Sequence, residues 1–132
     1  MVSVRSQQLA AIVALTGAAF AAEQARMAQI KARETMLRSQ LASLDAHRQA
    51  RAAGLEGAAD TALRGGADPL WHQWIDRRRM ALNGELLRVL AEQDRVRAAL
   101  ARAFGREQAT IGLARAEHAA TAQKQARRAD HG

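Results

Sequence analysis

Few residues of this chain have types and spacings that could support chemistry. His72 and Asp76 stand four apart, and Asp68 precedes them by one helical turn. Such a pair lies on one face of a helix and can hold a metal ion. No third strong ligand accompanies the pair, and the chain has no cysteine. We therefore expect no metal site.

The motifs of common enzyme classes are also missing. The sequence has no phosphate-binding loop, nucleophile elbow or dinucleotide-binding fingerprint. His47, His118 and His131 have no neighbours of the kinds that would suggest catalysis. We expect a protein that is not an enzyme and uses no cofactor. The lack of cysteine leaves the redox compartment open.

Trp71 and Trp74, the only tryptophans, are the first candidates for partner binding. If the rings face outward, they form an aromatic anchor for a partner. If they face inward, they cover the end of a neighbouring helix, and both interpretations hold if one ring faces inward and the other outward. The cluster Arg77-Arg78-Arg79 follows directly, and its side chains point in different directions on a helix. We expect Arg79 to pair with Asp45, and we include Arg78 among the partner-binding candidates.

A second basic group lies near the C-terminus. Lys124, Arg127 and Arg128 fall in a stretch without apolar periodicity, which we expect to be a frayed tail over residues 123–132. The group could contact acidic protein, RNA or lipid headgroups, or simply be solvated. Arg127 and Arg128 complete the candidate partner-binding residues.

The tryptophans open a long predicted helix over residues 68–122. Asp68 suits an N-cap and Pro69 the first helical position. Apolar residues then recur at steps of three, four or seven, namely at Ile75, Leu82, Leu86, Val89, Val96 and Leu100. After Leu100 the apolar residues shift by one position to Phe104 and Ile111, which predicts a stutter. A stripe this narrow and long needs a second long helix to cover it.

The upstream sequence supplies that helix over residues 3–53. One heptad frame runs through Val2, Ser6, Leu9, Val13, Thr16, Phe20, Glu23, Met27, Ile30, Glu34, Leu37, Leu41, Leu44, Arg48, Arg51 and Leu55. Residues 54–67 contain the glycines that permit a reversal. Pairing residue i with about 123 − i brings Leu41 opposite Leu82 and Phe20 opposite Ala103 or Phe104. The predicted fold over residues 1–132 is all-α, a long antiparallel two-helix coiled-coil hairpin.

Composition agrees with a helical interaction protein and bounds its partners. The chain has 132 residues and a formal charge of +7, with 18 arginines and two lysines. Arginine suits carboxylate and phosphate partners. Residues 1–66 carry +3 and residues 67–132 carry +4. Such an even spread is more typical of solvated helix faces than of a nucleic-acid-binding stripe, so we expect nucleic acid not to be the partner.

The N-terminal region has two readings. Arg5 followed by LAAIVALTGAAFAA is typical of a secretory signal peptide, with a possible cleavage site at Ala19-Phe20-Ala21. Against this, Leu9 and Val13 stay in phase with the seam beyond the supposed cleavage site. The apolar stretch is interrupted at Thr16 and Gly17, and we expect it to be too short to span a bilayer.

Helices of this length, a short tip and a second helix opening with W-x-x-W-I resemble the FliJ and YscO proteins. The matching residues are Trp71, Trp74, Ile75, Leu82, Leu86 and Leu90. The resemblance covers nearly the whole chain. These proteins are the soluble stalk of bacterial flagellar and injectisome type III export machines.

The resemblance implies a cytoplasmic stalk or adaptor, peripheral to the membrane export apparatus. Its implied partners are a hexameric export ATPase, the membrane-embedded export gate and export chaperones. The end of the hairpin near Ser6 and residues 115–128 would enter the ATPase ring, leaving the tryptophans for another partner. A nucleic-acid-binding coiled coil and a secreted periplasmic helical protein remain alternatives. Monomer and swapped dimer are both compatible with the sequence.

Overall fold

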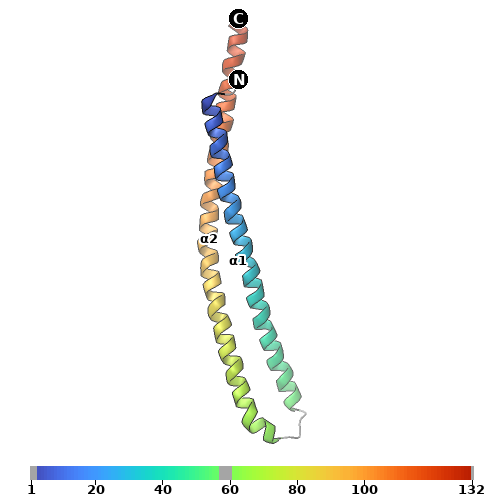
Figure 1. Ribbon diagram of the computed structural model, residues 1–132. Coiled ribbons are helices and arrows are strands. Elements are labelled where there is room, and N and C mark those ends of the chain that lie inside the picture. The colour runs from blue at the N-terminus through green and yellow to red at the C-terminus, as the bar shows by residue number, and fades with distance from the viewer. Residues whose placement is uncertain (1–2, 57–60, 132) are drawn as a thin grey trace. The chain divides into compact units, whose positions relative to one another are not determined.

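The protein consists of two long helices in an antiparallel hairpin (Figure 1). The computed structural model describes residues 3–56 and 61–131, with the side chains of residues 3–54 and 69–131. Helix α1 spans Val4–Glu56 and helix α2 spans Thr61–His131. No strand occurs in those two ranges. The predicted all-α hairpin is confirmed.

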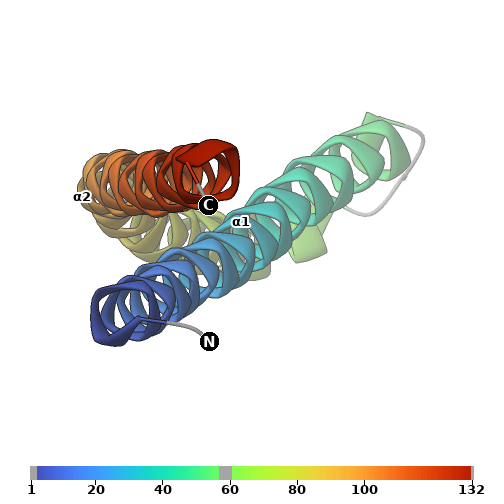
Figure 2. The ribbon, with the colours of Figure 1, turned by 90° about the horizontal axis from the view of Figure 1, so that it is seen from above.

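The chain divides into two compact units, each built from both helices. The terminal unit comprises Met1–Ala28 and Arg95–Gly132, and the inner unit comprises Gln29–Asp94. Figures 1 and 2 show the N-terminal part of α1 beside the C-terminal part of α2, which together form the terminal unit. In both units a segment of α1 lies along a segment of α2, so long-range contacts replace a globular core.

Helix α1 begins with a serine cap. The backbone N–H of Ser6 donates to Ser3 Oγ at 3.1 Å, which satisfies one of the unpaired amides of the first turn. The predicted heptad frame is then the covered side of the helix. Every frame position from Ser6 to Arg51 is buried or half-buried. Its buried members are Met27, Ile30, Leu37 and Leu44.

Helix α2 presents a matching seam. Residues buried at a strict seven-residue interval are Ile75, Leu82, Val89, Val96 and Ala103. The same interval continues to Thr110 and Glu117, which are half-buried. The predicted stutter after Leu100 is therefore wrong, because Phe104, the apolar residue that suggested it, is 49 % exposed. Position in the heptad, rather than apolar character, decides which residue enters the seam.

Contacts across the helices place the register close to the predicted one. In the inner unit, Arg79 Nη2 lies 3.3 Å from Asp45 Oδ1, as expected from the sequence. In the terminal unit, the Phe20 and Phe104 ring centroids are 5.5 Å apart. Both pairs fall within one residue of the predicted pairing. Each helix thus covers the apolar stripe of the other.

The second helix begins earlier than the sequence predicts. It starts at Thr61, so the predicted cap at Asp68 is wrong. The predicted tip over residues 54–67 is also wrong in part, because residues 54–56 belong to α1 and residues 61–67 belong to α2. Residues 57–60 of that tip lie outside the described part of the chain. Pro69 consequently lies inside α2. A proline there removes one intrahelical hydrogen bond, and the preceding Gly65, Gly66 and Asp68 are also poor helix formers, so this first part of α2 has little intrinsic helix preference.

The predicted frayed tail is also wrong. Residues 123–131 continue α2 without a break to His131. The segment contains alanine, glutamine, arginine and lysine, all good helix formers, and neither glycine nor proline before residue 132. The missing apolar periodicity marks a helix exposed on all sides, because residues 122–131 are exposed.

Candidate partner-binding surfaces

The turn of α2 around Ile75 decides where the two tryptophans point. Ile75 is 2 % exposed and lies in the seam of the inner unit. Trp71 precedes it by four residues, shares its side of the helix and is half-buried. Trp74 is offset from Ile75 by about 100° around the helix and is 57 % exposed. The two rings therefore face different surroundings, one towards α1 and the other towards solvent.

Trp71 packs against an arginine of α1. The guanidinium carbon of Arg51 lies 4.3 Å from the centroid of the Trp71 ring. The His72 ring meets Trp71 edge-on, with the centroids 5.2 Å apart. A guanidinium over an indole face contributes about 0.5–1 kcal/mol at a partly exposed site. Trp71 thus has a structural role in joining α2 to α1.

Two ion pairs next to Trp71 link the helices. One joins Arg79 to Asp45, and the other joins Arg48 Nη1 to Asp76 Oδ1 at 3.9 Å. These residues surround a polar groove of about 440 Å³, lined by Asp45, Arg48, Gln49, Ala52 and Arg79. Pairs this exposed stabilise folding by roughly 0–1 kcal/mol each. Their effect is to favour one register of the helices.

The outer side of α2 near Trp74 carries apolar and cationic groups together. Leu70 is 67 % exposed and lies one turn before Trp74. Arg77 and Arg78 follow, both are exposed, and neither forms an ion pair with any described residue. We call Leu70, Trp74, Arg77 and Arg78 the Trp74 surface. An apolar anchor beside free guanidinium groups suits a partner with an apolar residue among carboxylates.

The cations near the C-terminus belong to the terminal unit. Lys124, Arg127 and Arg128 are exposed and are not in ion pairs with described residues. Because this segment is helical, residues three and four apart are neighbours on one face. The three charges therefore form one cationic face, which we call the tail face. The sequence identified these residues as one basic group, but only the helix places them on one face.

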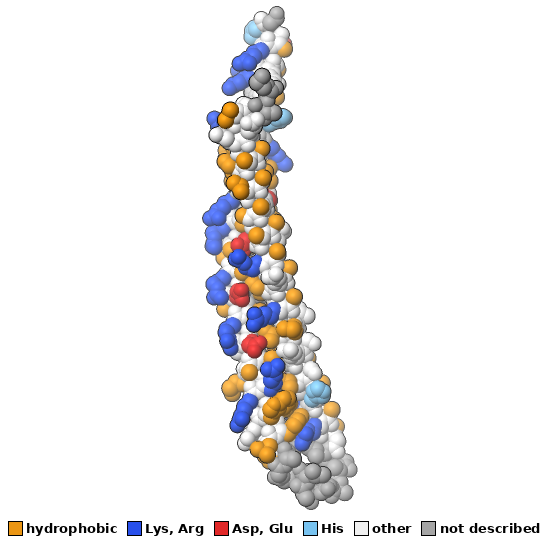
Figure 3. Space-filling model, viewed as in Figure 1, with side chains coloured by type: hydrophobic (Ala, Val, Ile, Leu, Met, Phe, Trp, Pro, Cys, Tyr) orange, Lys and Arg blue, Asp and Glu red, His pale blue; other side chains and the backbone are white. Residues whose placement is uncertain are grey.

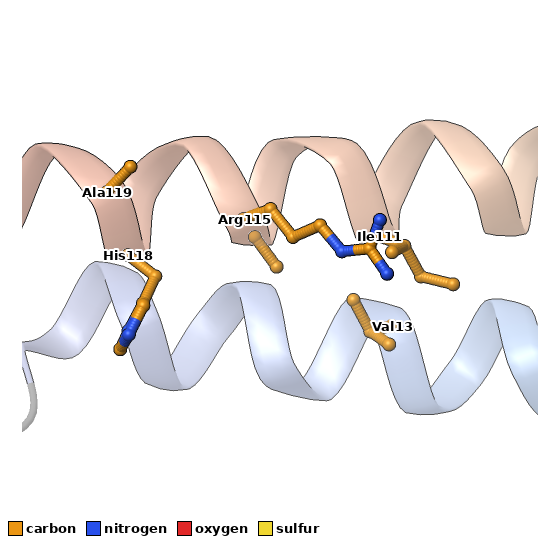
Figure 4. Close-up of a pocket in the computed structure, with 6 residues that line it drawn as sticks. Val13, Ile111, Arg115, His118 and Ala119 are labelled. Atoms are coloured by element: carbon orange, nitrogen blue, oxygen red, sulfur yellow. The ribbon is translucent and has the colours of Figure 1, made fainter.

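An apolar groove runs between the helices in the terminal unit (Figure 4). It has a volume of about 460 Å³ and is lined by Val13, Ile111, Ala114, Arg115, His118 and Ala119. Val13 of α1 faces Ile111 of α2, and the Arg115 side chain extends along α2 towards Ile111. The groove exists because Ile111 falls beside the seam rather than within it.

The structure also shows a surface that was absent from the candidates chosen by sequence. Large apolar side chains of α1 in the terminal unit point outward, with Val4 69 %, Ile12 42 % and Leu15 71 % exposed. By length and composition, α1 contains one segment apolar enough to cross a membrane, and none of that segment is buried. The expectation that the stretch was too short for this is not upheld. The absence of charged residues from residues 6–22 is the feature of the sequence that could have identified this surface.

Asp68, which lies one turn before the pair His72 and Asp76, is outside the residues whose side chains the structure describes. No group of three or more His, Cys, Asp or Glu side chains that could hold a metal occurs among the described residues. Asp76 instead faces Arg48, and His72 lies against Trp71.

The residues that the sequence suggests for partner binding thus fall into separate groups. Trp71, Trp74 and Arg78 lie within two turns of α2 in the inner unit, whereas Arg127 and Arg128 belong to the terminal unit. Comparison with known proteins finds no family model, no curated protein and no solved structure that matches this chain. The function must therefore be inferred from the exposed surfaces.

Proposed function

We propose that this chain is a non-enzymatic stalk or adaptor of a bacterial type III export apparatus, cytoplasmic and peripheral to the membrane. The observation that carries the proposal is the distribution of side chains around the hairpin. The seam holds the two helices together, while Trp74, Arg78, Arg127 and Arg128 remain on the outside. The W-x-x-W-I segment that resembles the export stalk proteins supplies one of these exposed surfaces.

The two surfaces would serve different partners. The tail face offers three cations on a helix, which suits acidic loops lining the pore of a hexameric export ATPase. The Trp74 surface offers an aromatic anchor, which suits the export gate or an export chaperone. Both are outside the seam, so partners could bind without separating the helices.

The proposed contact between the tail face and the export ATPase is tested by reversing the charge of the tail face. R127E/R128E should weaken binding to the purified export ATPase hexamer by about tenfold or more, since two attractive contacts become repulsive. The matched control is R102E/R106E, which reverses two exposed arginines of α2 in the same unit. Binding measured by interferometry that is unchanged in R127E/R128E would remove the tail face from the proposal.

The proposed contact of the Trp74 surface is tested by truncating Trp74. Trp74→Ala should weaken binding to the export gate or a chaperone, because a truncated aromatic anchor typically costs about 2 kcal/mol or more. Leu87→Ala is the control, since Leu87 is 68 % exposed on the same helix but outside the Trp74 surface. Equal losses in both variants would contradict a role specific to Trp74.

A mobility-shift experiment with duplex DNA distinguishes the export stalk from a nucleic-acid-binding coiled coil. A DNA-binding coiled coil would shift duplex mobility with steep salt dependence. The proposal expects no shift in moderate salt, and a shift that persists there would favour the alternative.

A further inference from the structure

The N-terminal part of α1 over residues 9–22 has no polar side chain on the side that faces solvent. Residues 9–22 contain no charged side chain, and Thr16 is their only hydrogen-bonding side chain. Thr16 lies in the seam, where its hydroxyl is 2.8 Å from that of Thr110. The side facing solvent is therefore wholly apolar. Helices that are apolar all round are normally covered by protein or lipid.

The exposed apolar side chains extend over both helices of the terminal unit. Leu15, Ile12 and Val4 lie on α1, and Leu113 of α2 is 58 % exposed. The alanines of α1 between the larger residues, Ala11, Ala18, Ala19 and Ala22, are exposed as well. On the face viewed in Figure 3, orange and white atoms cover the N-terminal part of α1. We call Val4, Ile12, Leu15 and Leu113, with those alanines, the apolar terminal surface.

Arginines mark both ends of this apolar segment. Arg5 and Arg26 are 21 residues apart, about 31 Å along a helix, and their side chains are 76 % and 58 % exposed. Arg26 lies within about 20° of the Leu15 row around the helix. Both arginines are in ion pairs, Arg5 with Glu117 and Arg26 with Glu23, which hold their charges at the two ends of the segment. Long cationic side chains at the ends of such a segment can lie at the level of the lipid headgroups while apolar neighbours enter the acyl boundary.

The positive charge of the protein is concentrated in the same unit. The terminal unit contains ten basic and four acidic residues, a net charge of +6, whereas the inner unit contains ten and nine, a net charge of +1. The tail face contributes three of these cations. Cations close to an anionic lipid surface are attracted to it. The terminal unit therefore combines the two features that attract a protein to an anionic bilayer.

We propose that the apolar terminal surface docks on an anionic lipid bilayer, with α1 lying in the membrane interface. A second copy of the chain is a poorer occupant, because it would bring two units of charge +6 together. The opposite side of α1 stays on α2 through Thr16–Thr110 and Phe20–Phe104, so the helix lies along the surface rather than crossing it. The tail face is shared with the proposed ATPase contact, but the apolar terminal surface itself has no part in the proposed function.

Vesicle binding by the full chain tests the proposal. The protein should co-sediment with mixed phosphatidylcholine–phosphatidylglycerol vesicles and bind pure phosphatidylcholine much more weakly. I12E/L15E should lower the partition coefficient by about tenfold or more, as expected when two apolar side chains no longer enter the interface. The matched control M36E/L87E changes two residues of the inner unit that are 53 % and 68 % exposed, and it should bind like the unchanged protein.

A probe at one site checks which surface enters the lipid. Because the chain has no cysteine, Leu15→Cys can be labelled uniquely with an environment-sensitive fluorophore. Its emission should shift to the blue on addition of mixed vesicles, whereas the same label at Met36→Cys should not shift. Both substitutions are at exposed positions, so each variant should retain the helicity of the unchanged chain.

Three results would overturn the proposal. The first is no binding to mixed vesicles. The second is binding that survives I12E/L15E but is lost in R127E/R128E, which would assign it to the tail face alone. The third is a dimer in solution that I12E/L15E converts to monomer without any vesicle binding, which would make the surface an interface between copies. ATPase binding should be unaffected by I12E/L15E, so this test fails or succeeds separately from the proposed function.

Discussion

Single side chains of the seam differ widely in how completely they are covered. Leu37 and Leu82 are each 1 % exposed, whereas seam residues Leu41 and Leu86 are only half-buried. In the terminal unit the buried seam position is occupied by the small residue Ala103, and the neighbouring Phe104 ring lies beside the seam against Phe20. A two-helix interface is thin, so few side chains can contribute the full transfer free energy of an apolar group.

Leu37→Ala tests whether a few fully covered seam residues contribute most of the stability. We expect it to lower the free energy of unfolding by about 2–5 kcal/mol, because it removes a covered side chain and leaves a cavity. Leu87→Ala is the matched control at a 68 % exposed position and should change stability by about 0.5 kcal/mol or less. Urea denaturation followed by circular dichroism measures both. Similar losses in the two variants would show that Leu37 is not enclosed.

At the scale of the helices, cross-helix polar contacts select the register that the apolar seam permits. Arg5 Nε lies 3.2 Å from Glu117 Oε2 in the terminal unit, and Arg79 pairs with Asp45 in the inner unit. The seam glutamates Glu23 and Glu34 instead bond to Arg26 and Arg38 of their own helix. Apolar residues repeat every turn and tolerate a slip, whereas a slip would separate the paired charges.

The start of α2 gives a prediction about Pro69. If Pro69 lies inside the helix, Pro69→Ala should raise the free energy of unfolding by about 1–3 kcal/mol, since it restores a hydrogen bond and relieves a clash. At the first position of a helix starting near Asp68, the same change would be close to neutral. Urea denaturation distinguishes the two, and carbon chemical shifts of residues 61–68 locate the helix start directly.

Gly84→Ala is a suitable control for that experiment. Gly84 lies well inside α2, and an added Cβ would make an ordinary contact at 3.7 Å with Arg88. It should stabilise the protein by about 0.5–1 kcal/mol wherever α2 begins. A stabilising effect of Gly84→Ala alongside a neutral Pro69→Ala would contradict the early start.

For the whole molecule, folding back of α2 on α1 determines how charge is distributed. The two halves of the sequence carry +3 and +4, but the two structural units carry +6 and +1. The units differ because each combines segments from both ends of the sequence. The terminal unit thereby joins the excess of positive charge to the outward apolar residues of α1.

Closure within one chain can be tested by a disulfide between the helices. In T16C/T110C the sulfur atoms replace hydroxyl oxygens that are 2.8 Å apart, so oxidation at low protein concentration should give an intrachain bond. The bond closes a loop of 94 residues and should add roughly 4–5 kcal/mol to stability. T16C/L113C is the control, because Leu113 is exposed and outside the seam. Crosslinked dimers on non-reducing gels would indicate exchange of helices between chains.

Much of the fold was predictable from the sequence because a heptad pattern depends only on local spacing. The seam of α1 from Ser6 to Arg51, the pairing of Arg79 with Asp45 and the contact of Phe20 with Phe104 all follow from that spacing.

Other features were decided only by the tertiary structure. Apolar character favours Phe104 as the seam residue, yet the opposing helix accepts Ala103, which leaves Phe104 and Ile111 to form the side of a groove. Trp71 is half-buried because it shares the seam side of α2 with Ile75 and lies under Arg51 of the other helix, whereas Trp74 lies away from the seam and is exposed. Residue type sets the free energy gained on burial, but the neighbouring helix determines which residues are buried.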